Sequence, residues 1–359
     1  MLLRRIHLQN FRNIKFAALN FEAHSQFFLG PNGQGKTNLL EAISLLTALR
    51  SFRTQDIKTL IQHGTSETQL FFGIDHPIEG DMEILLKLKS QEKELFVNDN
   101  KINKFSEFIG KIPIVVLSSE DMQLLRGAPA LRRKFLDLTL SAMDGDYFND
   151  LRRYHRALLE RNALLRQMAS KSMIELYNPI LAPLAFNIYQ KRSKNIELLR
   201  LYLTESYSSL VQEVEEPEII YRPDCILHSK DDFLEILSKG FDRDASFKST
   251  QNGPQRDDLE FKLKSKGARQ YGSEGQQRGL VIALRLAQIR YFNEYSGLKP
   301  IILADDILGQ LDPLRSNAFW KTLDPSFQVI ATGTTLPDKT SDRDWQIYNV
   351  SNGNFLLNK

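Results

Sequence analysis

The chain has 359 residues, of which 42% are hydrophobic and 25% are charged, a composition that excludes intrinsic disorder and is typical of a soluble folded protein. Single hydrophobic cores stop growing at roughly 250 to 300 residues, so two lobes are expected. The 47 basic and 44 acidic residues give a net charge of only +3, so binding of a polyanion would require a local basic patch.

Short strands and one glycine loop are predicted in the first third of the chain. Alternating apolar residues from Leu2 to Leu8 indicate a strand. The apolar run at 27–29 leads into a glycine-rich loop, and apolar residues at helical spacing follow from Lys36 to Leu49. Further strands are predicted at Gln69–Ile74, Met82–Leu88 and Ile112–Leu117.

The pattern becomes helical between about Gly127 and Val214, and strands return after about Arg243. These later strands are expected at Leu259–Leu263, Lys299–Ala304 and Phe327–Ala331, with a helix between Gly275 and Phe292. We therefore predict an α/β head formed by residues 1–125 and 245–359, with an inserted, mainly helical lobe at 126–244. Charge divides this lobe, because residues 126–200 carry 14 basic against 7 acidic residues and residues 205–244 carry 4 against 11.

The glycine loop fits the phosphate-binding pattern G-x-x-x-x-G-K-S/T, between a strand and a helix as that pattern requires. Its backbone N–H groups would surround phosphates at the positive end of a helix. Lys36 is expected to reach the β and γ phosphates of ATP, and the Thr37 hydroxyl to ligate Mg²⁺. The alternative is a purely structural glycine turn. The expected ATP-binding residues of this segment are Gly30, Pro31, Asn32, Gly33, Gln34, Gly35, Lys36, Thr37 and Asn38.

An apolar strand at 301–304 ends in two acids, the form of a Walker B element. Asp305 is expected to hold magnesium and Asp306 to orient or deprotonate the attacking water. Taken alone, such a strand end can equally be solvated and without function.

A third motif, Gly272-Ser273-Glu274-Gly275-Gln276-Gln277, opens a helix and resembles the signature of ABC ATPases at Ser273, Gly275 and Gln276. Residues 309–312, which end in Asp312, resemble the D-loop of the same superfamily. This resemblance implies that the signature binds the γ-phosphate held by a second subunit. The alternative is that the motif is an ordinary helix N-cap without a role in nucleotide binding.

The order and spacing of several stretches resemble the RecF family of recombination and gap-repair ATPases over nearly the whole chain. The matching stretches lie at 8–13, 33–43, 132–137, 253–259 and 271–278. The resemblance implies an ABC-type ATPase head, a cytoplasmic location, ATP-dependent dimerisation and binding of double-stranded DNA at gaps. It also implies that the protein acts together with RecR and RecO to promote RecA loading. The same resemblance places Arg12 and Asn13 near the nucleotide.

The chain departs from the family pattern at two positions, because Gln255 replaces a usual His and Glu274 replaces the Gly of the ABC signature. ABC transporters usually carry Glu at the position of Asp306. Asp is one methylene shorter, so we expect slow hydrolysis. The role of Arg256, Asp257 and Asp258 is left open between an ion-pair network and a functional site.

Two other functions share the three motifs. A transporter ATPase generally keeps them closer than the 236 positions between Thr37 and Ser273. An ABC-type nuclease would need a second cluster of metal ligands, and the histidines are scattered without ligand spacing. The single cysteine, Cys225, and the absence of an apolar span or leader at the N-terminus fit a reducing cytoplasm.

Candidates for DNA contact lie in the basic part of the helical lobe. Arg152, Arg153 and Arg156 occupy one side of a helix whose opposite stripe, Leu151, Tyr154 and Leu158, is expected to pack inward. The alternative is a solvated basic face. Arg132 and Arg133 are expected to be structural.

Overall fold

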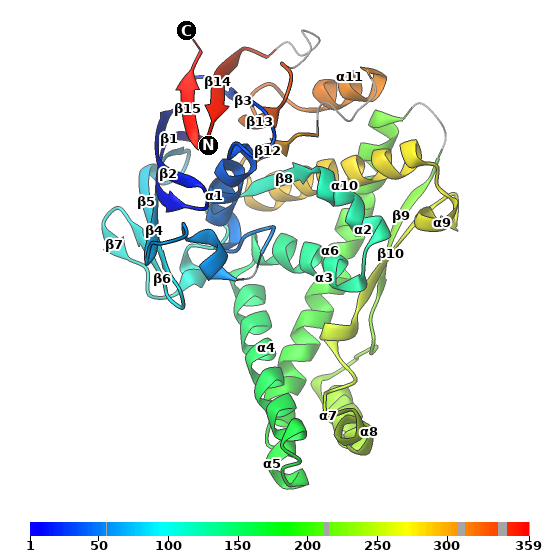
Figure 1. The fold of residues 1–359 in the computed structure, drawn as a ribbon. Coiled ribbons are helices and arrows are strands. Elements are labelled where there is room, and N and C mark those ends of the chain that lie inside the picture. The colour runs from blue at the N-terminus through cyan, green and yellow to red at the C-terminus, as the bar shows by residue number, and fades with distance from the viewer. Residues whose placement is uncertain (55, 212–214, 308–312, 337–342, 359) are drawn as a thin grey trace. The chain divides into compact units, whose positions relative to one another are not determined.

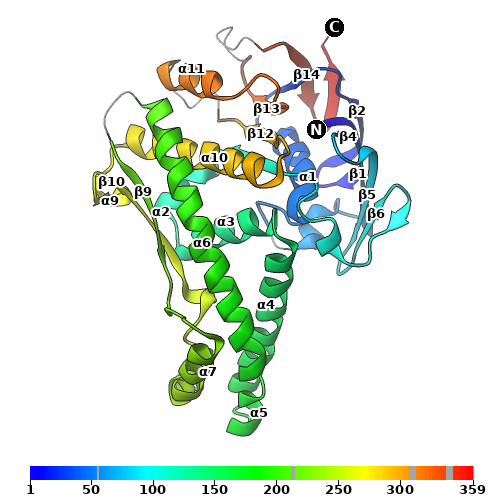
Figure 2. The same ribbon diagram turned by 180° about the vertical axis from the view of Figure 1, so that it is seen from behind.

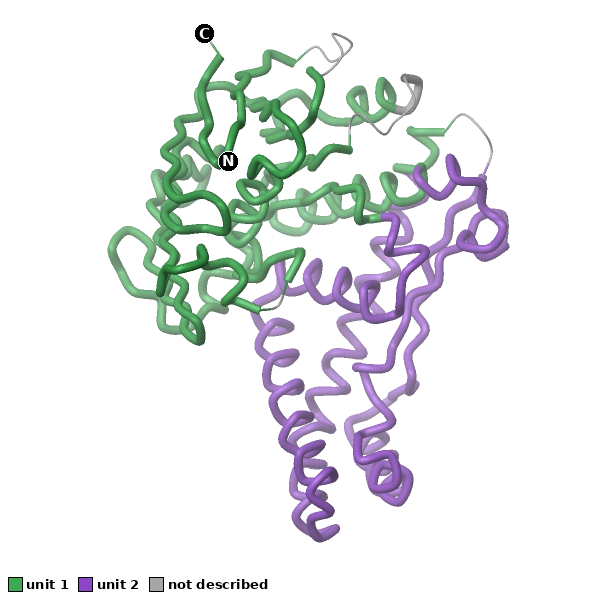
Figure 3. Tube along the Cα trace, in the orientation of Figure 1, with its two compact units in different colours: residues 1–121, 206–214, 279–359 green, residues 122–205, 215–278 purple. Residues whose placement is uncertain are grey.

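The computed structural model describes residues 1–54, 56–211, 215–307, 313–336 and 343–358. The chain forms two compact units (Figure 3). The first contains residues 1–121, 206–214 and 279–359, and the second contains residues 122–205 and 215–278. Within the described residues, no helix combines the length and the apolar character needed to cross a membrane.

The first sheet of the first unit is antiparallel, with the strand order β2-β1-β4-β5-β6-β7. The period-two alternation seen at the N-terminus becomes β1, whose residues Ile6 and Leu8 are buried while His7 and Gln9 are exposed. One face of this sheet therefore belongs to the core. Its strands are β1 (Leu2–Phe11), β2 (Ile14–Asn20), β4 (Glu67–His76), β5 (Gly80–Lys89), β6 (Lys93–Val97) and β7 (Asn100–Lys101).

The second sheet of this unit has the order β15-β14-β3-β13-β12-β8, in which the five strands from β14 to β8 run parallel and β15 is antiparallel. Its central strands are buried along almost their whole length, and β12 is a continuous apolar run up to Asp305, as expected for parallel strands buried on both faces. The strands are β3 (Ser25–Leu29), β8 (Ile114–Ser118), β12 (Ile301–Asp305), β13 (Val329–Gly333), β14 (Trp345–Ser351) and β15 (Asn354–Leu357).

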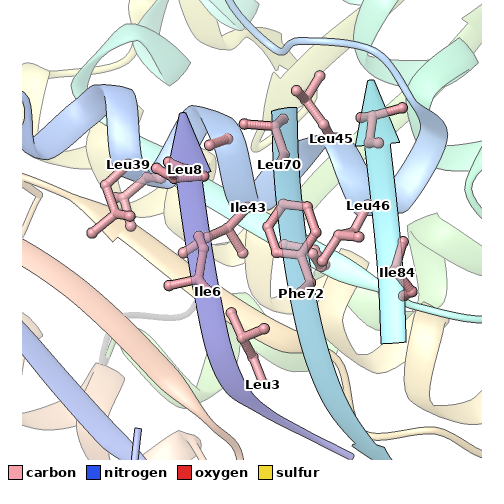
Figure 4. Close-up of a cluster of buried hydrophobic side chains, with 14 of the residues drawn as sticks. Leu3, Ile6, Leu8, Leu39, Ile43, Leu45, Leu46, Leu70, Phe72 and Ile84 are labelled. Atoms are coloured by element: carbon pink, nitrogen blue, oxygen red, sulfur yellow. The ribbon is translucent and has the colours of Figure 1, made fainter. Parts of the chain in front are cut away.

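Helix α1 (Lys36–Ala48) lies in the hydrophobic core that both sheets share. Figure 4 shows Leu39, Ile43 and Leu46 of this helix against apolar side chains of β1, β4 and β5. Ile301 and Leu303 of β12 and Ile330 of β13 belong to the same buried cluster. The core therefore fixes α1, and with it the glycine loop at its N-terminus, against the end of β12. The described part of this unit also contains α11 (Pro313–Thr322).

The second unit is mainly helical. Helix α4 (Gly145–Arg166) starts at the N-cap Asp144, which accepts a hydrogen bond from the Tyr147 N–H at 2.8 Å. It runs beside α6 (Asn178–Leu210), as both views show (Figures 1 and 2), and Lys191 of α6 forms an ion pair of 2.8 Å with Asp144. The other helices are α2 (Gln123–Arg126), α3 (Pro129–Ser141), α5 (Lys171–Glu175), α7 (Lys230–Lys239), α8 (Phe241–Phe247) and α9 (Ala268–Tyr271), and α10 (Glu274–Ser296) begins in this unit.

A three-stranded antiparallel sheet completes the second unit, with β10 (Asp258–Leu263) between β9 (Pro217–Arg222) and β11 (Lys266–Gly267). The sequence pattern predicts that residues 245–278 belong to the head and that the inserted lobe at 126–244 is mainly helical. In the structure these residues belong to the second unit, because β10 pairs with β9 over its whole length, from Asp258 opposite Arg222 to Leu263 opposite Pro217. Residues 206–214 are instead part of the first unit.

Candidate nucleotide-binding site

The glycine loop joins β3 to α1 in a backbone conformation that other residues rarely adopt. Gly33 has φ of 80° and Gly35 has φ of 109°, both in the region that favours glycine. A Cβ at Gly35 would lie 3.0 Å from Oδ1 of Asn13, so this position also lacks space for a side chain. The loop is braced by the turn between β14 and β15, because the backbone N–H groups of Asn352 and Gly353 donate to Gln34 Oε1 at 2.7 Å and to Gln34 O at 2.8 Å.

Lys36, the first residue of α1, folds back over the loop. Its ammonium donates to the carbonyl oxygens of Gly30 and Pro31, the second at 2.8 Å, and only 5% of the residue is exposed. Burial lowers the pKa of Lys36, while the charges of Asp306 and Asp305 act in the opposite direction. The ammonium is thus held beside the loop by contacts that phosphate oxygens can replace.

Thr37 and Asp305 lie 268 positions apart in the chain and meet at the end of β12. The Thr37 hydroxyl donates to Asp305 Oδ1 at 2.9 Å. Thr332, at the end of β13, donates to the same oxygen at 2.8 Å and accepts from the backbone N–H of Asp306 at 3.0 Å. Asp306 itself has φ of 51°, in the left-handed region that Asp tolerates better than most residues. Thr332 therefore fixes both acids of the strand end.

Burial raises the pKa of Asp305, and the neighbouring charge of Asp306 acts in the same direction. The hydrogen bonds from Thr332 and Thr37 oppose this shift. A hydroxyl and a carboxylate in contact are the oxygen ligands that magnesium prefers, so Thr37 and Asp305 fit the role expected of them as metal ligands.

Arg12 and Asn13 occupy the turn between β1 and β2, beside the glycine loop. Asn13 Oδ1 accepts from Asn38 Nδ2 at 2.8 Å. Arg12, with φ of 53°, points its guanidinium to Glu41 of α1, with donor distances of 3.0 and 2.8 Å. The structure thus brings Arg12, Asn13 and Asn38 to the glycine loop.

The signature residues Ser273, Gly275 and Gln276 lie at the start of α10, in the second unit. The Ser273 hydroxyl accepts from the backbone N–H of Gln276 at 3.2 Å, and Gln276 Oε1 accepts from the Ser273 N–H at 2.7 Å. Ser273 therefore acts as a helix N-cap and is exposed to solvent. The predicted D-loop residue, Asp312, lies outside the described residues.

The acidic residues that follow β8 differ in their surroundings. Asp121 is buried and accepts from the Ser118 N–H at 3.0 Å and from Arg285 Nε at 3.0 Å. Its carboxylate is therefore committed to a buried ion pair, whereas Glu120 is exposed.

Comparison with known proteins shows the family of this chain. Residues 2–353 match the family model described as the RecF/RecN/SMC N terminal domain. The chain is 32% identical to the DNA replication and repair protein RecF of Lactobacillus johnsonii, over 98% of each chain. The chain belongs to the RecF family.

Solved structures show the same relationship. The recombination mediator protein RecF-ATP of the RecFOR pathway is 29% identical, and the match covers 99% of this chain and 97% of that chain with a TM-score of 0.90. The SMC head bound to the C-winged helix domain of ScpA matches with a TM-score of 0.55 at 15% identity, over 100% of this chain and 97% of that chain, which shows the fold alone. The predicted fold class, an α/β ABC-type ATPase head, is confirmed.

The RecF-family stretch at 253–259 forms a buried network in the second unit. Asp257 accepts from Arg192 Nη1 at 2.6 Å and from the Asp224 N–H at 2.9 Å, and the Tyr221 hydroxyl donates to it as well. Asp258 accepts two hydrogen bonds from Arg132, at 2.7 and 3.0 Å. Of the two roles left open for Arg256, Asp257 and Asp258, the structure shows the ion-pair network for the two acids, and it confirms that Arg132 is structural. Arg256 is exposed and donates to Gln251 Oε1 at 3.2 Å, and among the described residues it forms no ion pair.

Arg133 also has a structural contact, since it donates to the backbone carbonyl of Asp257 at 2.8 Å. The stripe Leu151, Tyr154 and Leu158 of α4 is buried, as predicted. The three arginines proposed for DNA contact, Arg152, Arg153 and Arg156, are exposed on the same helix.

Sequence reasoning missed four residues that shape these sites. They are Glu41, Arg53, Arg192 and Thr332. For Glu41 a signal existed, because it is the one charged residue in the run Leu39–Leu46 that otherwise packs into the core. Arg53, Arg192 and Thr332 have no such local signal, since their partners lie on other segments.

Proposed function

We propose that this protein is an ATP-gated, DNA-binding recombination mediator that hydrolyses ATP slowly in order to reset itself. The observation that carries this proposal is the contact of Thr37 with Asp305 at the glycine loop, because it unites the two halves of an ATPase site from opposite ends of the chain. The 29% identical RecF-ATP structure supports ATP as the nucleotide.

In this proposal the glycine loop and Lys36 bind the phosphates of ATP, and Thr37 and Asp305 hold a magnesium ion. Such an ion neutralises charge on the phosphate oxygens. Asp306 orients or deprotonates the attacking water. Its side chain is one methylene shorter than Glu, which supports slow turnover.

Dimerisation is expected because the ATP site needs two motifs, the glycine loop of one subunit and the signature of another. The signature residues project from the start of α10, and Ser273 is exposed there. A second copy of the chain can then complete the γ-phosphate site with its own Ser273, Gly275 and Gln276, and with Asp312 of its D-loop. ADP lacks the γ-phosphate and should not support this contact.

We expect Ser273→Arg to leave ATP binding by the monomer intact but to abolish dimer formation and turnover, since the bulky cation blocks the partner's nucleotide. Light scattering with ATP or ADP in the presence of Mg²⁺ measures the dimer directly. Ser273→Ala removes only the hydroxyl, so it should reduce dimer formation less than Ser273→Arg does. If the wild-type protein stays monomeric with ATP at all concentrations, the proposed dimer does not exist.

The proposed DNA ligand is duplex or gapped DNA, bound without sequence choice through its phosphates. Arg152, Arg153 and Arg156 lie on the solvent side of α4, and no hydrogen bond or ion pair engages them among the described residues. Closure of an ATP-bound dimer would supply two such faces to one duplex. We further propose that the protein acts with RecR and RecO, because the RecF-ATP structure belongs to the RecFOR pathway. Together they would promote the loading of RecA at single-strand gaps, so RecA is an indirect partner.

Changing Arg152, Arg153 and Arg156 together to Glu should weaken DNA binding and flatten its dependence on salt, because fewer counterions are released from DNA. Fluorescence anisotropy of labelled gapped and blunt duplexes over a salt series measures both effects. The matched control changes Lys230, Lys239 and Arg243 to Glu, which alters the charge equally on exposed residues of another part of the same unit. Equal losses in both triple variants would place the DNA elsewhere.

A further inference from the structure

A fully buried carboxylate lies next to the glycine loop. Glu41 of α1 is charged, yet 0% of its surface is exposed, and its neighbours on the helix pack into the apolar core. A buried charge is costly unless cations and hydrogen bonds compensate it. The partners of Glu41 therefore indicate why this position carries an acid.

Two arginines and one serine converge on this carboxylate. Arg12 binds it through two parallel donors, Nε to Oε2 at 3.0 Å and Nη2 to Oε1 at 2.8 Å. Arg53 Nη1 donates to Oε2 at 3.2 Å, and the Ser51 hydroxyl donates to Oε1 at 2.5 Å. Glu41 thus joins the β1–β2 turn to the segment that follows α1.

The same cluster touches the glycine loop through Asn38. Asn38 Oδ1 accepts from Arg53 Nη1 at 3.0 Å, and Asn38 Nδ2 donates to Asn13 Oδ1 at 2.8 Å. That oxygen lies where a Cβ of Gly35 would be crowded. Arg53 is therefore bound directly to Asn38 of the phosphate-binding segment, and Arg12 is bound to Glu41, further along the same helix.

The cluster has more positive than negative charge, because two guanidiniums share one carboxylate. The side chains of Arg12 and Arg53 are 20% and 34% exposed, so both reach solvent while Glu41 does not. Arg12 Nη1 and Arg53 Nε and Nη2 have no hydrogen-bond partner among the described residues. These donors are free to bind an anion beside the glycine loop.

We infer that Glu41 is a positioning residue, which holds Arg12 and Arg53 in place so that their remaining N–H donors bind the phosphates of the nucleotide. The inference rests on the proposed function, in which the loop binds ATP. A preorganised arginine loses less side-chain entropy when its ligand arrives, so fixing two of them before binding raises affinity.

The test is the affinity for ATP of Glu41→Gln, measured by isothermal titration calorimetry. The neutral amide cannot hold two guanidiniums, so we expect binding about 10- to 100-fold weaker than wild type, the range of a lost charged hydrogen bond. Glu83→Gln is the matched control, since Glu83 forms an exposed ion pair of 2.9 Å with Arg5 on the first sheet. Its affinity should equal that of wild type.

A thermodynamic cycle separates positioning from general support of the fold. When Arg12 and Arg53 are both changed to Ala, the further change Glu41→Gln should have little effect on ATP affinity. An equal loss in both backgrounds, or wild-type affinity of Glu41→Gln, would overturn the inference. If Glu41→Gln does not fold, Glu41→Asp takes its place, because it keeps the charge but is too short for the paired contact with Arg12. A wild-type protein that binds no ATP would instead refute the proposed function.

Discussion

Asp306→Asn is expected to lower the rate of ATP hydrolysis by roughly 10² to 10⁴-fold, the range typical of a lost general base. Asn adopts the left-handed backbone conformation as readily as Asp, so the φ of 51° and the hydrogen bond from its N–H to Thr332 should persist. Only the carboxylate is removed. Single-turnover release of phosphate measures the chemical step.

ATP binding should survive in this variant, since Lys36, Thr37 and Asp305 keep their contacts. Removing a negative charge near the phosphates favours their binding, so the ATP-bound dimer should accumulate and bind DNA at least as well as wild type. Asp306→Ala is a poorer probe, because Ala in this conformation costs about 1 to 2 kcal/mol. Unchanged turnover in Asp306→Asn would assign the base elsewhere, and exposed Glu120 would then be preferred to Asp121, whose carboxylate is paired with Arg285.

Much of the fold of the first unit can be predicted from local patterns. Alternation along β1 and the continuous apolar run of β12 reflect burial on one face and on two faces, respectively. Strand pairing between distant segments leaves no such pattern. β9 pairs with β10 through residues that lie far apart in the chain, such as Arg222 and Asp258, which are 36 positions apart. The prediction that residues 245–278 belong to the head is wrong for this reason.

The residues of the candidate site also differ in whether local sequence patterns predict them. The glycine loop and the Asp305-Asp306 strand end are visible because their chemistry requires fixed residue types at fixed spacing. Thr332 and Arg53 act through contacts across the fold, and Thr or Arg at such positions is unremarkable in a sequence. Glu41 is intermediate, since a charge in an apolar helical run indicates a buried partner but does not identify it.

The second large effect is expected for Lys36→Ala, which should weaken ATP binding by at least about 100-fold, because a charged donor to the phosphates is lost. In the structure this ammonium is held by the carbonyl oxygens of Gly30 and Pro31. Calorimetric titration with ATP and Mg²⁺ measures the loss. Turnover and dimer formation should disappear with it, in contrast to Ser273→Arg, which should still bind ATP.

Stability measurements decide whether this loss reflects binding or folding. Burial lowers the pKa of Lys36, so the fold disfavours the charge of its ammonium. Gly30 and Pro31 are both at least partly exposed, so water can replace the lost donor at their carbonyl oxygens. Urea unfolding without nucleotide should therefore change by no more than about 1 kcal/mol. Lys93→Ala is the matched control, because Lys93 donates to the carbonyl of Leu49 at 2.6 Å beyond the other end of α1. Wild-type ATP affinity in Lys36→Ala would show that the glycine loop binds phosphate through its backbone alone, without help from the lysine.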